Sequence, residues 1–94
     1  MSYRLLYHPD IRSVDLPKIN AKLQTRIARA IEQRLTVEPA YYGEPLRRTL
    51  KGFWKLRVGD YRVIYEIVGQ EVRILRIGHR KDVYVSAPRR FMIK

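Results

Sequence analysis

Lysine and arginine side chains crowd the stretch from residue 47 to residue 62. This stretch holds a single acid, Asp60. The cations are Arg47, Arg48, Lys51, Lys55, Arg57 and Arg62. Guanidinium and ammonium groups hold phosphate oxygens and stabilise negative charge that develops during a reaction. The pattern therefore indicates chemistry on a phosphate group.

A second run of basic residues lies nearer the C-terminus and leads to a tyrosine. The run consists of Arg73, Arg76, Arg80 and Lys81, and it ends in Tyr84. Aromatic rings among cations favour a nucleic acid as the ligand, because bases stack on such rings for about 1–3 kcal/mol each. Tyr61 and Tyr65 fall on the apolar side of their strand pattern, so we expect both in the core.

Several other chemistries lack the residues that they need. The chain has no cysteine, which excludes a thiol nucleophile and thiolate metal sites. His8 and His79 lie far apart, and no two acids form a closely spaced pair, which disfavours zinc and two-metal chemistry. We therefore expect neither a metal nor another cofactor. Cations, a tyrosine and His79 remain as candidates for proton transfer.

The composition favours one small domain with an anionic partner. The 94 residues include 20 Lys and Arg against 9 Asp and Glu, which gives a net charge of +11. Solubility does not require this imbalance, which is typical of proteins that bind nucleic acid or another polyanion, an acidic protein included. We see no signal-peptide pattern and no apolar run of the roughly 20 residues that cross a membrane. A cytoplasmic protein without membrane contacts is expected.

The elements that must position these residues follow from the apolar pattern. A strand is expected over residues 3–7 and a helical turn over 10–14. A long helix is predicted from residue 17 or 18 to 37, because apolar side chains recur along it every three or four residues. These side chains are Ile19, Leu23, Ile27, Ala30, Ile31 and Leu35. We expect Asp15 to cap this helix and Pro39 to end it.

Three strands are predicted in the second half of the chain, over residues 53–58, 61–68 and 71–78. The pairs Gly59-Asp60 and Gly69-Gln70 suit tight turns between them. Residues 38–52 are expected to form a loop anchored by Leu46 and Leu50, and 82–87 could begin a helix. This order predicts a single α+β domain. Its N-terminal strand and helices pack on one face of a small, mainly antiparallel sheet.

The predicted hairpin places like charges opposite each other. If Gly59 and Asp60 form the turn, Arg57 faces Arg62, and alternation puts Lys55 on the same side. Like charges directly opposite destabilise a sheet, so stability alone does not explain the pair. A solvated face with splayed side chains is the simpler alternative, but the crowding of cations favours a phosphate-binding face.

Two motifs resemble those of a known toxin family. Residues 55–66 (Lys-Leu-Arg-Val-Gly-Asp-Tyr-Arg-Val-Ile-Tyr-Glu) are similar to the central hairpin of RelE-type toxins in the RelE/ParE superfamily. Residues 77–84 (Ile-Gly-His-Arg-Lys-Asp-Val-Tyr) resemble the end of their last strand. The long helix and the loop over 46–52 match as well, so the resemblance spans nearly the whole chain. It implies a RelE-like microbial RNase fold and a toxin that cuts messenger RNA on the ribosome.

The resemblance also implies roles for individual residues. Lys55 matches a lysine that abstracts a proton, and Arg62 matches an arginine that stabilises the transition state. Arg80 matches a proposed general acid, although an arginine stays protonated far above neutral pH and suits electrostatic stabilisation better. Tyr84 matches a tyrosine that orients or stacks on the substrate base. Further RNA contacts are expected from Arg47, Arg48, Lys51, Arg57, His79 and Lys81.

The base stays open between Lys55 and His79. Phe53 replaces a second lysine of the best-studied members, and Tyr84 is closer to the preceding arginine than in some members. Neighbouring cations favour the neutral form of a lysine. His79 lies on the opposite strand face from Arg80, which favours a structural role.

RNA supplies its own nucleophile, the 2′-hydroxyl, so the implied activity is metal-independent. The main alternative is a ParE-like inhibitor of DNA gyrase without RNase activity, a branch that usually lacks the set of Lys55, Arg62, Arg80 and Tyr84. An inactive nucleic-acid-binding relative is a third interpretation. The expected partners are messenger RNA, the ribosome and a RelB-like antitoxin that is acidic and partly disordered.

Overall fold

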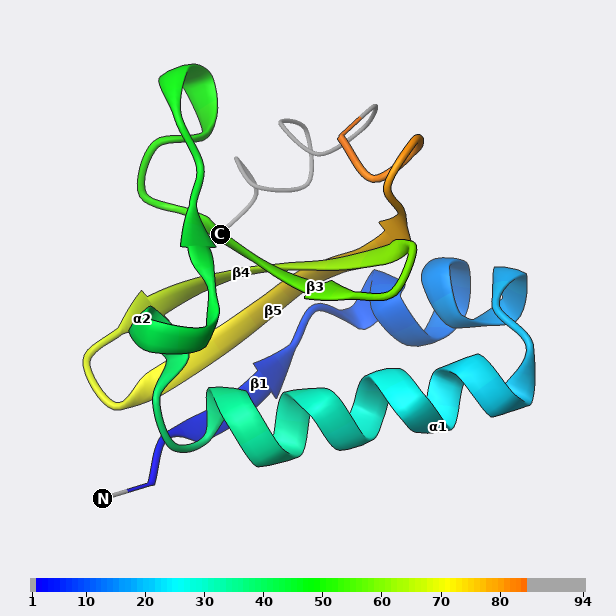
Figure 1. Cartoon of the computed structure of the whole chain (residues 1–94), viewed down its shortest axis with the longest axis horizontal. Helices are drawn as coiled ribbons and strands as arrows, with labels where there is room; N and C mark the ends of the chain where they lie inside the picture. The colour runs from blue at the N-terminus through cyan, green and yellow to red at the C-terminus, as the bar shows by residue number, and fades with distance from the viewer. Residues whose placement is uncertain (1, 85–94) are drawn as a thin grey trace.

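The strands form one five-stranded sheet in the order β1-β5-β4-β3-β2 (Figure 1). The structure is a computed structural model, and it describes residues 2–84. The strands are β1 (Arg4–Tyr7), β2 (Glu44–Pro45), β3 (Trp54–Val58), β4 (Tyr61–Val68) and β5 (Glu71–His79). β1 runs parallel to β5, and the other neighbours are antiparallel. The predicted α+β class with a mainly antiparallel sheet is confirmed.

The meander β3–β4–β5 forms the centre of the sheet and agrees with the predicted strands to within one residue. Gly59 and Gly69 begin the two turns with a φ of 60° each. Two-residue hairpin turns need this left-handed conformation, which costs glycine little. Arg57 pairs with Arg62, as the turn chemistry predicts.

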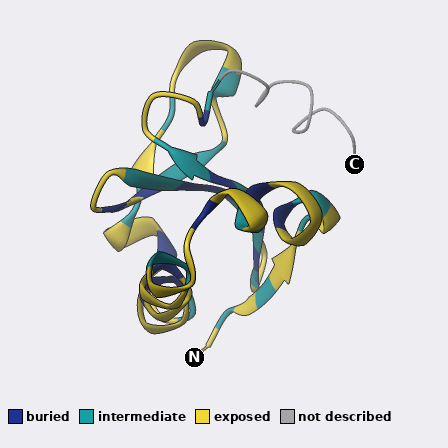
Figure 2. Ribbon diagram, turned by 90° about the vertical axis from the view of Figure 1, so that its right-hand side faces the viewer, coloured by how far each residue is buried: buried dark blue, intermediate teal, exposed yellow. Residues whose placement is uncertain are grey.

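Helical segments cover one face of the sheet. They are η1 (Ile11–Asp15), η2 (Leu16–Lys18), α1 (Ala21–Ala30), η3 (Ile31–Leu35) and α2 (Pro39–Tyr42). The short η4 (Arg48–Leu50) lies over the opposite face. Figure 2 shows α1 nearly end-on against the sheet, with its buried side turned inward. Ile27, Ile31 and Leu35 are at most 1% exposed, which confirms the predicted apolar stripe. Each such side chain contributes about 1.5–3 kcal/mol by leaving water.

The start of the long helix differs from the prediction. Ile19 has an extended backbone that separates η2 from α1, and Asn20 caps α1 by accepting a hydrogen bond from the Leu23 N–H at 2.9 Å. The predicted cap, Asp15, was wrong: it is buried and accepts from the Ile77 N–H at 2.9 Å. β1 pairs with β5 only as far as Ile74, so Asp15 supplies an acceptor beyond the end of β1.

Apolar clusters lie on both faces of the sheet. Beneath the helices, Tyr65 is fully buried in the main core, and Tyr61 packs against that core. On the other face, Ile64, Leu75 and Val83 form a second cluster. Leu46, Leu50, Phe53 and Tyr84 cover it. Leu46 and Leu50 are therefore anchors, as predicted, but on the face away from α1.

The segment predicted as a loop contains short elements, namely α2, β2 and η4. Residues 80–84 form turns, and the rest of the tentative helix over 82–87 lies outside the described residues. Among the residues that the structure describes, no helix has the length and apolar character to cross a membrane.

Candidate functional site

Four cationic residues of the central strands occupy positions on the side of the sheet opposite the main core, and we call them the cationic face: Lys55, Arg57, Arg62 and Arg76. The first three alternate with core residues in the β3–β4 register. A bulge brings in the fourth. Ile64 pairs with Arg76 and Tyr65 with Ile74, so Leu75 is the extra residue of β5. Bulges re-aim side chains, and this one turns Leu75 and Arg76 toward the same side as Ile64.

The β3–β4 turn gathers two of the predicted site residues. Arg62 donates from Nη1 to the carbonyl oxygens of Gly59 at 3.0 Å and Tyr61 at 2.9 Å. The backbone N–H of Arg80 donates to the Asp60 carbonyl at 2.8 Å, and its Nε lies 3.7 Å from the Asp60 carboxylate. That ion pair is largely exposed, so it orients Arg80 more than it stabilises the fold. Arg62 and Arg80 are therefore both anchored to the β3–β4 turn, at one end of the sheet.

Tyr84 lies within the electrostatic field of Arg62. Burial against the second apolar cluster raises the pKa of the Tyr84 phenol, the charge of Arg62 lowers it, and Glu44 raises it. The net shift is upward, so the phenol stays protonated at neutral pH and can donate a hydrogen bond. Arg76 donates from Nη2 to the Asp82 carbonyl at 3.4 Å, which ties β5 to the segment that carries Tyr84.

Lys55 lies between two strands on the cationic face. Its register partners are Ile64 on β4 and Glu44 on β2. The side chain is half-buried, whereas Arg57, two residues along, is exposed. The structure thus places Lys55 on the same face as Arg62, with an apolar neighbour on one side and an acid on the other.

Three basic residues lie in the segment over residues 46–51, which packs on the second apolar cluster. Arg47, Arg48 and Lys51 are exposed, while Leu46 and Leu50 anchor the same loop in the second apolar cluster. Arg48 has a φ of 59°, the left-handed conformation that side chains with a Cβ avoid.

His79 and Lys81 are not brought into this group. His79 pairs with Tyr61 in the sheet, on the side of the main core, and the two rings make an edge contact at 5.6 Å. Its Nδ1 accepts from the Lys81 N–H at 3.2 Å. Lys81 is exposed in the turn after β5.

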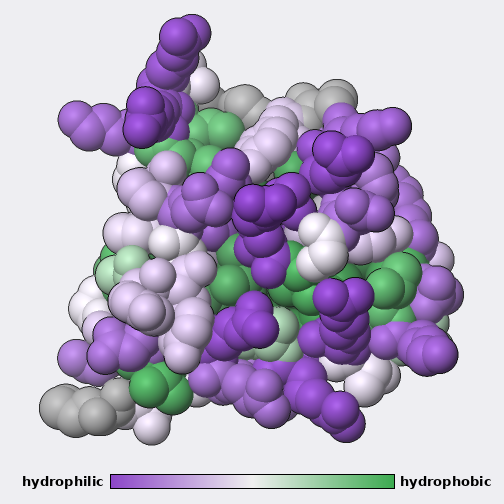
Figure 3. All heavy atoms as spheres, in the orientation of Figure 1, coloured by the Kyte–Doolittle hydropathy of each residue, from purple (hydrophilic) through white to green (hydrophobic). Residues whose placement is uncertain are grey.

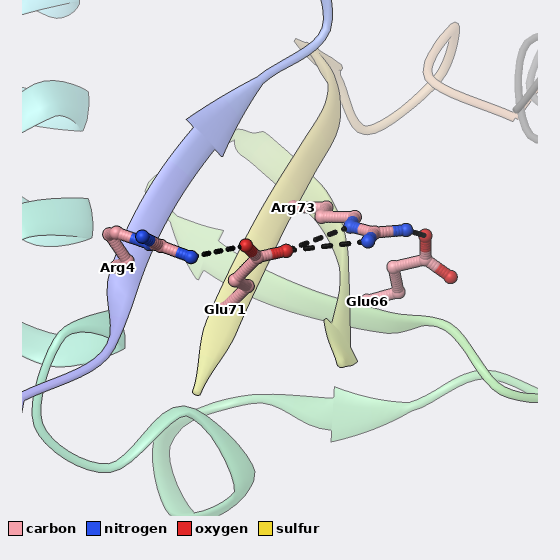
Figure 4. Close-up of polar contacts among 4 residues, drawn as sticks. All are labelled: Arg4, Glu66, Glu71 and Arg73. Atoms are coloured by element: carbon pink, nitrogen blue, oxygen red, sulfur yellow. Dashed lines mark hydrogen bonds and ion pairs between the residues drawn. The ribbon is translucent and has the colours of Figure 1, made fainter. Parts of the chain in front are cut away.

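Acidic residues lie around an arginine at the opposite end of the sheet. Figure 4 shows Arg73 between Glu66 and Glu71, at 3.6 Å and 3.3 Å, and Arg4 against Glu71 at 2.6 Å. A hydrogen bond from Arg4 lowers the pKa of Glu71, so the carboxylate stays charged. Arg73 is therefore neutralised by its neighbours. Residues 2–84 contain no group of three His, Asp or Glu side chains that could hold a metal ion.

Two contributors to this arrangement are not apparent from the sequence. Arg76 is there only one more basic residue, because a bulge leaves no local signal in the sequence. Asp60 is predicted only as a turn residue, and its pairing with Arg80 joins two turns that are distant in the chain.

Comparison with known proteins places the chain in a family. Residues 5–84 match the model of the ParE toxin of the type II toxin–antitoxin system, parDE. Two toxins of Mycobacterium tuberculosis are similar in sequence. Toxin RelG is 38% identical over 74% of this chain and 83% of its own length, and Toxin RelE is 33% identical over 87% and 90%.

A solved structure agrees with these sequence matches. The toxin–antitoxin complex RelBE2 of M. tuberculosis contains a chain with 33% identity and a TM-score of 0.79. The match covers 85% of this chain and all of that one. The protein therefore belongs to the RelE/ParE superfamily, the toxins of type II toxin–antitoxin systems.

Proposed function

We propose that this toxin is a ribosome-dependent endoribonuclease that cuts messenger RNA through attack of a 2′-hydroxyl on the adjacent phosphate. The observation that carries the proposal is that Arg62 and Arg80 both bind the β3–β4 turn, and that the charge of Arg62 acts on Tyr84. Relatives named RelE and RelG at more than 30% identity support it.

The protein must assist the proposed reaction at three points. The 2′-hydroxyl must lose its proton while its oxygen forms a bond to phosphorus. The phosphate then carries extra negative charge, and the bond to the 5′-oxygen breaks as that oxygen gains a proton. The products are a 2′,3′-cyclic phosphate and a 5′-hydroxyl. No metal ion is required at any of these steps.

The residues of the site can divide this work. The guanidinium groups of Arg62 and Arg80 stabilise the negative charge that develops on the phosphate. Groups that are already held in position do this effectively, because they need not reorganise during the reaction. The backbone carbonyls of the turn hold Arg62 in place without cancelling its charge. Lys55 is the proposed base, since His79 lies on the other side of the sheet. Tyr84 orients or stacks on a base of the substrate.

We further infer that an antitoxin binds this chain. The structural neighbour from M. tuberculosis is a toxin–antitoxin complex, and the similar toxin covers nearly the whole fold. A net charge of +11 suits an acidic partner. Messenger RNA and the ribosome complete the proposed set of partners.

One observation favours the second candidate, inhibition of DNA gyrase without RNA cleavage. The matching family model carries the ParE name. A supercoiling assay with purified gyrase tests this alternative directly. Inhibition of gyrase by a protein that leaves messenger RNA intact on translating ribosomes would select it over the nuclease.

The deciding experiment for the nuclease compares Arg62 variants on translating ribosomes. We expect Arg62→Ala to lower the rate of messenger RNA cleavage by about 10²–10³-fold, the usual cost of losing one preorganised charge donor. Primer extension maps the cut sites, and thermal melting checks the fold. Arg62→Lys keeps the charge but loses the planar fork, so we expect an intermediate rate.

Arg73→Ala is the matched control, because Arg73 lies on the same sheet face but is neutralised by Glu66 and Glu71. It should cleave at close to the original rate once corrected for the folded fraction. A folded Arg62→Ala protein with unchanged cleavage would place the site elsewhere.

A further inference from the structure

A groove separates α1 from the β3–β4 turn on the helical side of the molecule. Its volume is about 520 Å³. Five cations line it: Lys22, Arg26, Arg29, Arg34 and Arg57. The other described residues of its lining include the polar Thr25 and Gln33 but no acid and no aromatic ring. Hydrophilic side chains gather along α1 on the face seen in Figure 3.

Arg34 lies over the Tyr42 ring, 6.0 Å from its centroid, but the row of like charges along α1 does not stabilise the fold. Lys22, Arg26 and Arg29 follow one another at spacings of four and three, which puts like charges side by side on one helix face and destabilises the helix. Within residues 2–84, no ion pair joins any of the five cations of the groove to a carboxylate. An anionic ligand would remove this repulsion.

The acidic residue of the segment formed by α1 and η3 is Glu32, and it lies outside the groove. Burial and then the negative charge of Glu32 raise the pKa of Tyr7, which belongs to β1. Glu32 is not among the residues that line the groove, and its charge acts on Tyr7 of β1. The groove is therefore lined by the basic side chains of this helical segment and not by its acidic one.

The β3–β4 turn forms the opposite wall and leaves room for an arginine. A Cβ on Gly59 would lie 3.3 Å from Nη1 of Arg26, so the guanidinium of Arg26 rests over the turn. From Lys22 to Gln33 the basic flank extends about 16 Å along the helix axis. Arg57 belongs to both the groove and the cationic face, so charge continues around the edge of β3.

The lining decides which anion the groove fits. Single-stranded RNA is usually held by stacking its bases on aromatic rings, and the groove has none. Paired RNA presents phosphates and 2′-hydroxyls, which suit guanidinium groups and the side chains of Thr25 and Gln33. A protein partner would bury an apolar centre. The apolar groove on the other flank of α1, lined by residues such as Ile11, Leu16 and Ile27, fits that need better.

We propose that the groove between α1 and the β3–β4 turn binds the sugar–phosphate backbone of a base-paired RNA segment, separately from the strand that is cut. The inference that the ligand of the groove is an anion rests on the lining residues alone. The choice of RNA over DNA also rests on the proposed function, since paired ribosomal RNA surrounds the messenger. The groove then helps to seat the toxin while the cationic face reaches the substrate.

The test measures binding of the isolated full chain to a labelled RNA hairpin of about 16 base pairs, the length that a shape-reading domain spans. Fluorescence anisotropy is recorded between about 50 and 200 mM salt. The groove variant is Arg26→Gln with Arg29→Gln. Its matched control is Arg12→Gln with Lys18→Gln, two exposed cations outside the groove with the same change in charge.

We expect the groove variant to bind the hairpin at least ten-fold more weakly, with a slope of log K against log salt that is smaller by about two. The control should stay within two-fold of the original protein, and so should Arg62→Ala. A DNA hairpin of the same length should bind more weakly than the RNA. Thermal melting confirms that each variant is folded.

Four results would overturn the proposal. Equal losses in the groove variant and its control would reduce the effect to general charge. Loss of hairpin binding in Arg62→Ala alone would show a single RNA surface, and equal binding of DNA would remove the assignment to RNA. Polyglutamate binding can be measured in the same way. If the groove variant loses more affinity for polyglutamate than for the RNA hairpin, the occupant of the groove is an acidic protein. Cleavage is not read out, so failure of the nuclease proposal leaves this test intact.

Discussion

Arginines on the outer sheet face are held in two different ways. Arg73 sits between two carboxylates, so its charge is largely cancelled. Arg62 is held by backbone carbonyls of the turn, which orient the guanidinium but leave its full charge. A phosphate of the ligand should bind more strongly to an arginine held as Arg62 is, because it does not compete with a neighbouring carboxylate for the guanidinium.

Lys55 can be tested at the scale of a single residue. If it removes the 2′-hydroxyl proton, Lys55→Ala should lower the single-turnover cleavage rate by about 10²–10⁴-fold, the range for general acid–base groups. Ribosome binding, measured by pelleting, should fall much less. Equal losses of cleavage and binding would make Lys55 a binding residue only.

Arg48 gives a prediction in which stability and activity move apart. Its left-handed backbone costs about 1–2 kcal/mol for a residue with a Cβ, whereas glycine adopts it readily. Arg48→Gly should therefore leave the free energy of unfolding unchanged or raise it by up to about 1 kcal/mol, since the flexible unfolded state offsets part of the gain. RNA affinity should fall. Urea denaturation and RNA binding, measured on the same sample, check both parts, and a large loss of stability would contradict the argument.

At the scale of elements, short irregular features position the site. The bulge in β5 turns Arg76 onto the cationic face, and the β3–β4 turn binds both Arg62 and Arg80. The two-residue strand β2 sets Glu44 beside Lys55. Regular strands alone would present alternate residues and would place neither Arg76 nor Arg80 in this way.

The junction of α2 and β2 depends on a close contact between Gly43 and Tyr65. The Tyr65 hydroxyl is buried and donates to the Pro39 carbonyl at 2.6 Å. A Cβ on Gly43 would overlap that hydroxyl and lie 2.8 Å from the ring carbon Cζ. We expect Gly43→Ala to destabilise the fold by about 1–3 kcal/mol through overpacking, and Tyr65→Phe by about 1 kcal/mol through the lost hydrogen bond.

The double variant should cost less than the sum of the two, because removal of the hydroxyl makes room for the new methyl group. Chemical denaturation of all four proteins completes the cycle. Strictly additive losses would show that the overlap is relieved by backbone movement. Burial also raises the pKa of Tyr65, so the original protein should lose stability as the pH rises above about 10, and Tyr65→Phe should lose less.

At the scale of the whole molecule, basic surfaces lie on both faces of the sheet. The cationic face and the groove beside α1 share Arg57 at the edge of β3. With a net charge of +11, the molecule attracts polyanions from several directions. A cell that makes such a toxin needs a partner that masks this charge.

We expect the antitoxin to carry an acidic, partly disordered segment that folds onto the toxin. Complementary charge should speed association and make the association rate constant fall steeply with salt, as screening shortens to about 8 Å at physiological ionic strength. Stopped-flow mixing across a salt series measures this dependence. A flat response would mean that apolar docking dominates, and the groove lined by Ile11, Leu16 and Ile27 would then be the first surface to test.

Much of the fold follows from local sequence patterns. The period of the apolar residues predicts the strands and the buried stripe of the helix, because each element must turn one side to the core. The pair Gly59-Asp60 sets the hairpin register, so the meeting of Arg57 and Arg62 is predictable from sequence. Motif resemblance adds the family and the candidate residues.

Other features depend on contacts between residues that are distant in the chain. Asp15 and Asn20 are equally good helix caps by residue type. The strand β1 ends before it reaches Ile77, so the Ile77 N–H donates to Asp15 instead, and Asn20 caps α1. The bulge that aims Arg76 and the groove between α1 and a turn exist only once the sheet is assembled. Local periodicity determines which side of an element is buried, whereas the packing of one element on another determines which exposed charges meet.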